Sequence, residues 1–144
     1  MKEDNVATVK KAYAAYEKGD IPEFLDQLTS DIKWFAIGPP HIIATAGTRY
    51  GRNQVAQYFA VLTALEEVQL FKPEEFIAEE DTVVSIGKLI TRLRRTGDLV
   101  ETPWVHVFNF YHGKISEFRS FYDSAAAVEA RLELKPLAAA VAHA

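Results

Sequence analysis

The sequence predicts an α+β fold, in which a cone-shaped, curved, mixed or antiparallel sheet wraps around three N-terminal helices. Two observations lead to this prediction. Up to about residue 65, apolar residues recur mainly at helical spacing, whereas from about residue 67 to 122 they alternate as in strands. A strongly bent sheet around helices leaves a cone, and its mouth is a natural pocket for a small molecule. We expect a single domain over residues 1–134 and an Ala-rich tail over 135–144.

Helices are expected in three stretches of the first half. Residues 3–18 carry apolar side chains at helical spacing, and Gly19 follows where a helix commonly ends. The segment Asp20-Ile21-Pro22-Glu23 has a capping residue, a first-turn proline and a glutamate, so a short second helix begins there. A third helix is expected from Arg52 to about Leu65.

Strands make up most of the rest. Ser30-Asp31 is expected to be a turn before a short strand over 32–37, and the Gly- and Pro-rich segment 38–51 to be a long loop that covers a site. Alternation predicts further strands over about residues 67–78, 82–95, 99–111 and 114–122. Asp123 is a good N-cap for a last short helix over 125–132.

The hairpin from Trp104 to Asp123 is where chemistry is expected. Alternate side chains of a strand share a face, so His106 lies in an aromatic row with Trp104 and Phe108. Imidazole titrates near neutrality and can give or take a proton at physiological pH. The alternative is a buried neutral histidine that only donates one hydrogen bond and packs among its aromatic neighbours.

Composition excludes several classes of site. The 16 basic residues are outnumbered by 20 acidic ones, which argues against a nucleic-acid binder. The absence of cysteine removes disulfides, thiolate nucleophiles and Cys-based zinc sites. The other histidines, His41, His112 and His143, have no metal-ligand spacing, so we expect neither a metal nor a cofactor. With no signal peptide and no membrane-length apolar run, a cytoplasmic protein without membrane contact is expected.

The order of short motifs along residues 4–132 resembles a known family. A helix, Gly-Asp, a short helix, Ser-Asp-x-x-Trp, Gly-Pro-Pro, Ala-Gly-Thr-x-x-Gly, a helix with Tyr-Phe and a Gly-Lys-Ile hairpin ending in Tyr-Asp follow one another. This order is similar to that of the SnoaL-like polyketide cyclases. They belong to the nuclear transport factor 2-like superfamily, together with ketosteroid isomerase and limonene epoxide hydrolase. The resemblance implies a cone-shaped α+β barrel that forms a homodimer through the outer face of its sheet.

The family's functional residues are matched only in part. The resemblance places a pocket histidine at His106, and puts the cyclases' catalytic aspartate on Ser120. It places ketosteroid isomerase's general-base aspartate near Ala36 and its helix tyrosine near Ala12, with Tyr13 or Tyr16 close by. The epoxide hydrolase's Arg-x-Asp falls around Gly87 and Leu89, so that chemistry is not expected here.

An apolar ligand pocket is expected around His106. Aromatic side chains suit a flat, greasy ligand, although for any one of them plain core packing is the more common role. The candidate ligand-binding residues are Tyr16, Trp34, Phe59, Trp104, Phe108, Phe118 and Tyr122. Ser120 is the second candidate catalytic residue, as a hydrogen-bond donor to a developing oxyanion.

Three functions remain open. The first is a cofactor-independent isomerase or cyclase acting on a polyketide-, steroid- or terpene-like molecule, with His106 as general acid or base. The second is a binding module of the same fold without acid–base chemistry. The third is a structural or interaction role with the pocket filled by its own side chains. A homodimer is expected because Val105, Val107, Tyr111 and Phe121 point outward.

Overall fold

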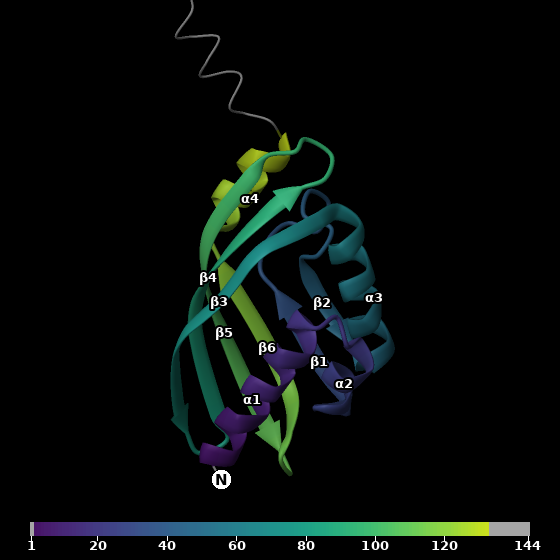
Figure 1. The fold of residues 1–144 in the computed structure, drawn as a ribbon. Helices are drawn as coiled ribbons and strands as arrows, with labels where there is room; N and C mark the ends of the chain where they lie inside the picture. Colours follow the sequence, from purple (N-terminus) through teal and green to yellow (C-terminus); the bar gives the residue numbers. More distant parts are fainter. Residues whose placement is uncertain (1, 133–144) are drawn as a thin grey trace, which may run out of the picture.

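A computed structural model describes residues 2–132 as an α+β fold built on one sheet (Figure 1). The Ala-rich tail expected at 135–144 lies outside the described residues. The helices are α1 (Lys2–Glu17), α2 (Ile21–Asp26), α3 (Gly51–Leu65) and α4 (Ser124–Leu132). The strands are β1 (Leu28–Ala36), β2 (Gly47–Tyr50), β3 (Glu66–Glu79), β4 (Thr82–Leu93), β5 (Leu99–Tyr111) and β6 (Lys114–Tyr122).

The sheet is mixed and has six strands in the order β2-β1-β6-β5-β4-β3. The neighbours β1 and β6 are parallel, and all other neighbouring strands are antiparallel. The long strands β3 to β5 bend along their length, and α1, α2 and α3 lie together on one side of the sheet (Figure 1). The predicted fold class, with three N-terminal helices against a curved sheet, is therefore confirmed.

Two local predictions were wrong. Ser30 and Asp31 do not form a turn, because they lie within β1, where the pairing with β6 shifts register between Leu28 and Lys33. The segment 38–51 is not wholly a loop, since its last residues form β2 against residues 33–36 of β1. Both differences arise from strand pairing with other segments of the chain, which local residue patterns do not encode.

Local capping signals are realised as the sequence predicts. Gly19 adopts a left-handed φ of 73°, and the amide of Asp20 donates to the Ala15 carbonyl at 2.8 Å, which closes the C-terminus of α1. The Asp20 carboxylate accepts from the Glu23 amide at 3.2 Å and begins α2. At the other end of the chain, Asp123 accepts from the Ala126 amide at 3.0 Å and begins α4.

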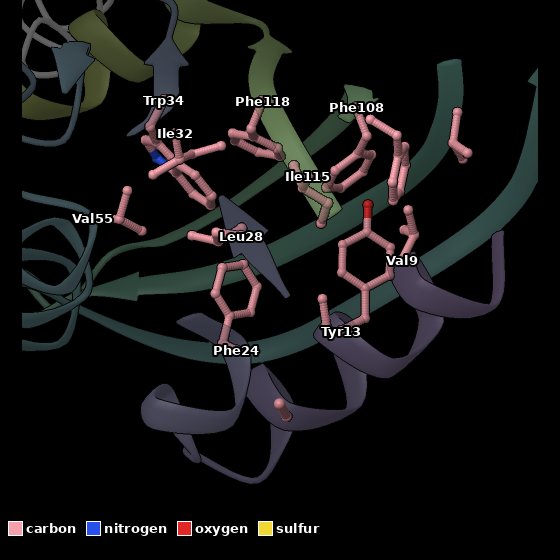
Figure 2. Close-up of a cluster of buried hydrophobic side chains, with 14 of the residues drawn as sticks. Val9, Tyr13, Phe24, Leu28, Ile32, Trp34, Val55, Phe108, Ile115 and Phe118 are labelled. Atoms are coloured by element: carbon pink, nitrogen blue, oxygen red, sulfur yellow. The ribbon is translucent and has the colours of Figure 1, made fainter. Parts of the chain in front are cut away.

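The main core lies between the helices and the concave face of the sheet. Figure 2 shows α1 and α2 side chains pointing toward those of β1, β5 and β6, with Trp34 lying against Phe118. The rings of Trp34 and Phe118 stack with centroids 3.9 Å apart. Because β1 and β6 pair in parallel register at this point, a residue from the first third of the chain and one from its end form one wall of the core.

Helix α4 lies apart from this core, at the top of the view in Figure 1. It contributes Ala127 to a small second cluster with Ile43 and Ala46. Its last turn is tied down by Arg131, which donates to the Glu66 carboxylate at 2.9 Å, and by Arg95, which donates to the Arg131 carbonyl at 2.9 Å. Helix α4 thus closes one end of the cone through few contacts.

Gly87 in β4 is needed for close packing rather than for backbone freedom. A Cβ at this position would lie well inside van der Waals distance of the Lys72 carbonyl oxygen and of the six-membered ring of Trp104. The indole of Trp104 therefore lies directly over the Gly87 backbone, across the β4–β5 pairing. Among residues 2–132, no helix is long and apolar enough to cross a membrane.

Candidate functional site

A cavity of about 140 Å³ lies inside the cone, between the helices and the concave face of the sheet. Its wall is formed mainly by aromatic side chains of α1, α3, β1, β3, β5 and β6. The structure brings every residue predicted for the site to this one wall, namely Tyr16, Trp34, Phe59, Trp104, His106, Phe108, Phe118, Ser120 and Tyr122. The pattern of alternation in the late hairpin thus placed its side chains on the correct face of the sheet.

His106 is held by a tyrosine of the first helix. The Tyr13 hydroxyl and His106 Nδ1 are 2.8 Å apart and share a hydrogen bond whose direction depends on the imidazole tautomer. Figure 2 shows the Tyr13 hydroxyl pointing away from α1 toward the sheet. Within the described chain no hydrogen bond uses Nε2, so this nitrogen is available to a ligand in the cavity.

The imidazole is the last ring of an aromatic stack. Trp104 lies parallel to His106 with centroids 4.0 Å apart, and Phe71 lies parallel to Trp104 at 5.0 Å. On the other side, Phe118 meets the imidazole edge-on at 4.9 Å. This packing fixes the plane of the ring, and therefore the direction in which Nε2 points.

Burial keeps His106 neutral. It lowers the pKa of His106 from its ordinary 6.5 to about 3, because the charged imidazolium loses hydration among aromatic rings. The hydrogen-bonded phenol is held neutral in the same way, since burial raises the pKa of Tyr13 above its usual range. At physiological pH the pair therefore presents a neutral imidazole to the cavity.

Ser120 lies directly across from His106 in the β5–β6 pairing, yet the two side chains are not hydrogen-bonded to each other. A Ser–His nucleophilic pair is thus not preformed in this structure. Tyr122 donates its hydroxyl to the Ile37 carbonyl at 2.9 Å, which fixes it against the segment after β1. Of these two candidate donors, Ser120 is the one whose hydroxyl is left for a ligand.

The opposite part of the wall, beneath α4, is polar. Glu66 is 7% exposed and pairs with Arg131, whose Nη2 lies 2.9 Å from Glu66 Oε2. Burial and then the Glu66 charge raise the pKa of Tyr16 to about 12. Burial first, with the same carboxylate contributing, also raises the pKa values of Tyr58 and Tyr122. A carboxylate and several phenols therefore lie close together at this end of the cavity.

Sequence reasoning missed several members of this wall. The sequence places Tyr13 only near the position of the ketosteroid isomerase tyrosine, and it does not predict Phe71, Glu66, Tyr58 or Arg131 as residues of the cavity wall. Tyr13 had a signal, because it lies on the apolar stripe of α1. Glu66 had none, because it is the first residue of β3 after a helix and its neighbour Glu67 is exposed.

Two arginines outside the cavity wall have structural roles. Arg92 of β4 donates to the Gly97 carbonyl in the following turn at 2.7 Å, and Arg94, just after β4, donates to the Thr63 carbonyl of α3 at 3.0 Å. Over residues 2–132 no group of three or more His, Cys, Asp or Glu side chains could hold a metal ion. The candidate site is therefore the cavity with its aromatic wall and two polar regions, one at His106 and Ser120 and the other at Glu66 and Arg131.

Comparison with known proteins identifies the family. The family model described as "SnoaL-like domain" matches residues 9–118, which include part of α1, most of the cavity wall and the His106 strand. The chain belongs to the SnoaL-like domain family. No curated protein matches this SnoaL-like chain significantly.

Solved structures similar to the SnoaL-like chain share its fold over nearly their whole length. An NTF2-like protein from Burkholderia xenovorans LB400 is 27% identical, with a TM-score of 0.81 over 91% of this chain and 98% of its own. An NTF2-like protein from Burkholderia pseudomallei K96243 is 25% identical, with a TM-score of 0.81 over 88% and 95%. TerC, co-crystallised with polyporic acid, is 25% identical, with a TM-score of 0.77 over 88% and 96%.

Proposed function

We propose that this SnoaL-like protein binds a small, largely apolar molecule of polyketide, steroid or terpene type in the cone cavity, through a hydrogen bond from His106 to a ligand oxygen. The observation that carries the proposal is the free Nε2 of a neutral imidazole among aromatic rings of the cavity wall. When Tyr13 donates to Nδ1, the imidazole carries its proton on Nε2 and donates to a ligand carbonyl. The co-crystal of the related TerC with polyporic acid supports an organic ligand for this fold.

Catalysis on such a ligand is the second candidate function. Ser120 faces His106 across the strand pair, so a carbonyl oxygen held by Nε2 can receive a second hydrogen bond from the serine. Charge developing on that oxygen during isomerisation or ring closure is then stabilised, with His106 as general acid or base. Neither step needs a cofactor. Ala36, on the cavity wall where ketosteroid isomerase is expected to carry its base, offers only a methyl group, which favours binding over enolisation.

Binding is tested with 1-tetralone and its hydrocarbon analogue tetralin, which differ only in the carbonyl. The wild-type protein is expected to bind the ketone about fivefold more tightly, the value of one neutral hydrogen bond. The substitution His106→Phe, which keeps a stacked ring, is expected to abolish this difference, and His112→Phe in the exposed turn to preserve it. Quenching of Trp34 and Trp104 fluorescence measures both affinities. Equal preference for the ketone in wild type and His106→Phe would contradict the proposal.

The two candidate functions are separated by proton exchange. Deuterium incorporation at the carbon next to the carbonyl of bound 2-tetralone, followed by NMR, is expected to depend on His106 if the protein is an isomerase or cyclase. Binding without such exchange identifies a binding module.

We also propose that the protein forms a homodimer through the convex face of the sheet. Strand pairing aligns Ile77, Val84, Val107 and Phe35 in one row on this face, interrupted only by Arg119. A second row contains Ile86, Val105 and Phe121. Ile77 is 55% exposed, and a contiguous apolar face of this kind is typical of an interface.

Val107→Lys tests the dimer, because it places a charge at the centre of this face. Sedimentation is expected to show a dimer for the wild-type protein at micromolar concentration and a monomer for Val107→Lys. Leu65→Lys, which changes an exposed leucine of α3, is expected to leave the dimer intact. A monomeric wild type would refute the proposal.

A further inference from the structure

We infer that the cavity contains a second hydrogen-bonding subsite, formed by Glu66, Tyr16 and Tyr58, which binds a neutral hydroxyl group of the ligand. The inference rests on the proposed function, because it concerns the same cavity, and it narrows the ligand class to flat hydroxy-ketones or hydroxyquinones. The carbonyl of such a ligand lies at His106 and its phenolic or enolic hydroxyl lies at Glu66.

The first observation is a buried carboxylate, that of Glu66, with one oxygen that accepts no hydrogen bond from the described residues. Glu66 is 7% exposed and lines the cavity. Its Oε2 accepts from Arg131 at 2.9 Å, but no hydrogen bond from any residue between 2 and 132 reaches Oε1. A buried carboxylate accepts several hydrogen bonds when it is fully satisfied, so Oε1 lacks a donor that a ligand can supply.

The second observation is that the hydroxyls of the neighbouring Tyr16 and Tyr58 also lack hydrogen-bond partners among the described residues. Tyr16 and Tyr58 line the cavity within the electrostatic reach of the Glu66 carboxylate. In the described chain their hydroxyls make no hydrogen bond, whereas Tyr122 nearby is bonded to the Ile37 carbonyl. Ring packing fixes both phenols, since Tyr16 meets Phe71 edge-on at 5.4 Å and Tyr58 meets Trp34 at 5.2 Å.

The charge of the subsite selects a neutral donor rather than a cation. Arg131 pairs directly with Glu66, so the negative charge of the carboxylate is already balanced by a positive one before the ligand binds. Nearby Asp123 lies on the wall at its exposed edge, where its carboxylate caps α4. A neutral hydroxyl gains a charge-assisted hydrogen bond to Oε1 without breaking the ion pair, whereas an ammonium group would also have to overcome the neighbouring arginine.

The polar region at His106 and the polar region at Glu66 make opposite kinds of hydrogen bond with the ligand. Neutral His106 with Tyr13 bonded to Nδ1 offers a donor, while Glu66 offers an acceptor. The aromatic walls between them, including Trp34, Phe59 and Trp104, exclude polar groups from the middle of the ligand. The ligand that satisfies every group has an acceptor at one end, a donor at the other and an aromatic or polycyclic body.

The experiment compares pairs of ketones in which the same oxygen carries either a hydrogen or a methyl group. The probes are 6-hydroxy-1-tetralone and 6-methoxy-1-tetralone, and the longer pair 4-hydroxychalcone and 4-methoxychalcone. The wild-type protein is expected to prefer the hydroxyl member of at least one pair by tenfold or more, as a hydrogen bond to a charged acceptor provides. Glu66→Gln is expected to reduce this preference to threefold or less.

The neighbouring carboxylate provides the matched control. Glu67 follows Glu66 in sequence but is about half exposed and paired with Arg94. Glu67→Gln is therefore expected to keep the full hydroxyl preference. If Glu66→Gln unfolds, Tyr58→Phe and Tyr16→Phe remove single hydroxyls from the same subsite, and each is expected to reduce the preference at least threefold.

The outcomes separate this inference from the proposed function. If no ketone binds, or binding does not depend on His106, the proposed function itself fails. If both members of each pair bind equally well in a His106-dependent manner, the cavity binds ketones but the second subsite is refuted. A hydroxyl preference that survives Glu66→Gln and both Tyr→Phe substitutions refutes it as well.

Discussion

Gly87→Ala is expected to destabilise the protein by roughly 3 kcal/mol, the upper end of what overpacking a core position usually costs. The added methyl collides with both the Lys72 carbonyl oxygen of β3 and the indole of Trp104 on β5. Because β4 lies between these two strands, neither neighbour can move without disturbing the sheet. Urea unfolding followed by circular dichroism measures the change in unfolding free energy.

Two further variants separate crowding from backbone strain. Gly113→Ala places a methyl where nothing lies within 4 Å but φ is 79°, so it is expected to cost only about 1 kcal/mol. The double substitution Gly87→Ala with Trp104→Phe removes the six-membered indole ring and is expected to recover part of the loss. A Gly87→Ala protein as stable as wild type would show that the strands can spread to accept the methyl.

Acid is expected to destabilise the fold through His106. The unfolded chain protonates this histidine below about pH 6.5, whereas the folded protein resists protonation until about pH 3. The stability contributed by the neutral imidazole is therefore fully present above pH 6.5, and is lost as pH falls toward 3. The slope attributable to His106 approaches about 1.4 kcal/mol per pH unit within that window.

Carboxylates also titrate in this pH window, so the effect of His106 is measured as the difference in unfolding free energy between the wild-type protein and a variant without this histidine. His106→Gln removes the titrating group, and its unfolding free energy is expected to fall less steeply with acid than that of wild type. His112→Gln, in the exposed turn of the same hairpin, is expected to follow the wild-type profile. Parallel profiles for wild type and His106→Gln would mean that solvent reaches the imidazole in the folded state.

The architecture was largely predictable because its signals are local. The apolar stripe of α1, the caps at Asp20 and Asp123 and the alternation of β4 to β6 each lie within a short segment. The face on which His106 and Trp104 lie followed from the period of a strand alone. Side chains predicted for the cavity wall therefore lie on it.

What escaped prediction depends on contacts between separate segments of the chain. Strand β2 exists because four residues of a Gly-rich segment pair with β1, and the Tyr13–His106 hydrogen bond joins the first helix to the fifth strand. Glu66 has its charged partner because α4 returns over the cone and supplies Arg131. No local pattern distinguishes this glutamate from its exposed neighbour Glu67.

The parallel pairing of β1 with β6 sets the order in which the molecule can assemble. The Tyr122 hydroxyl meets the Ile37 carbonyl from 85 positions away, and the same strands bring Trp34 onto Phe118. Closing so long a loop lowers the entropy of the chain before the stabilising contacts form, so this pairing favours slow folding. β1 can complete its pairing only after β6 has been made, whereas the β1–β2 pair and the hairpins of β3 to β6 join strands that follow one another in the chain. The wall of the cavity is therefore complete only when β6 is in place, and a chain that ends before β6 lacks Phe118, Ser120 and Tyr122 of that wall.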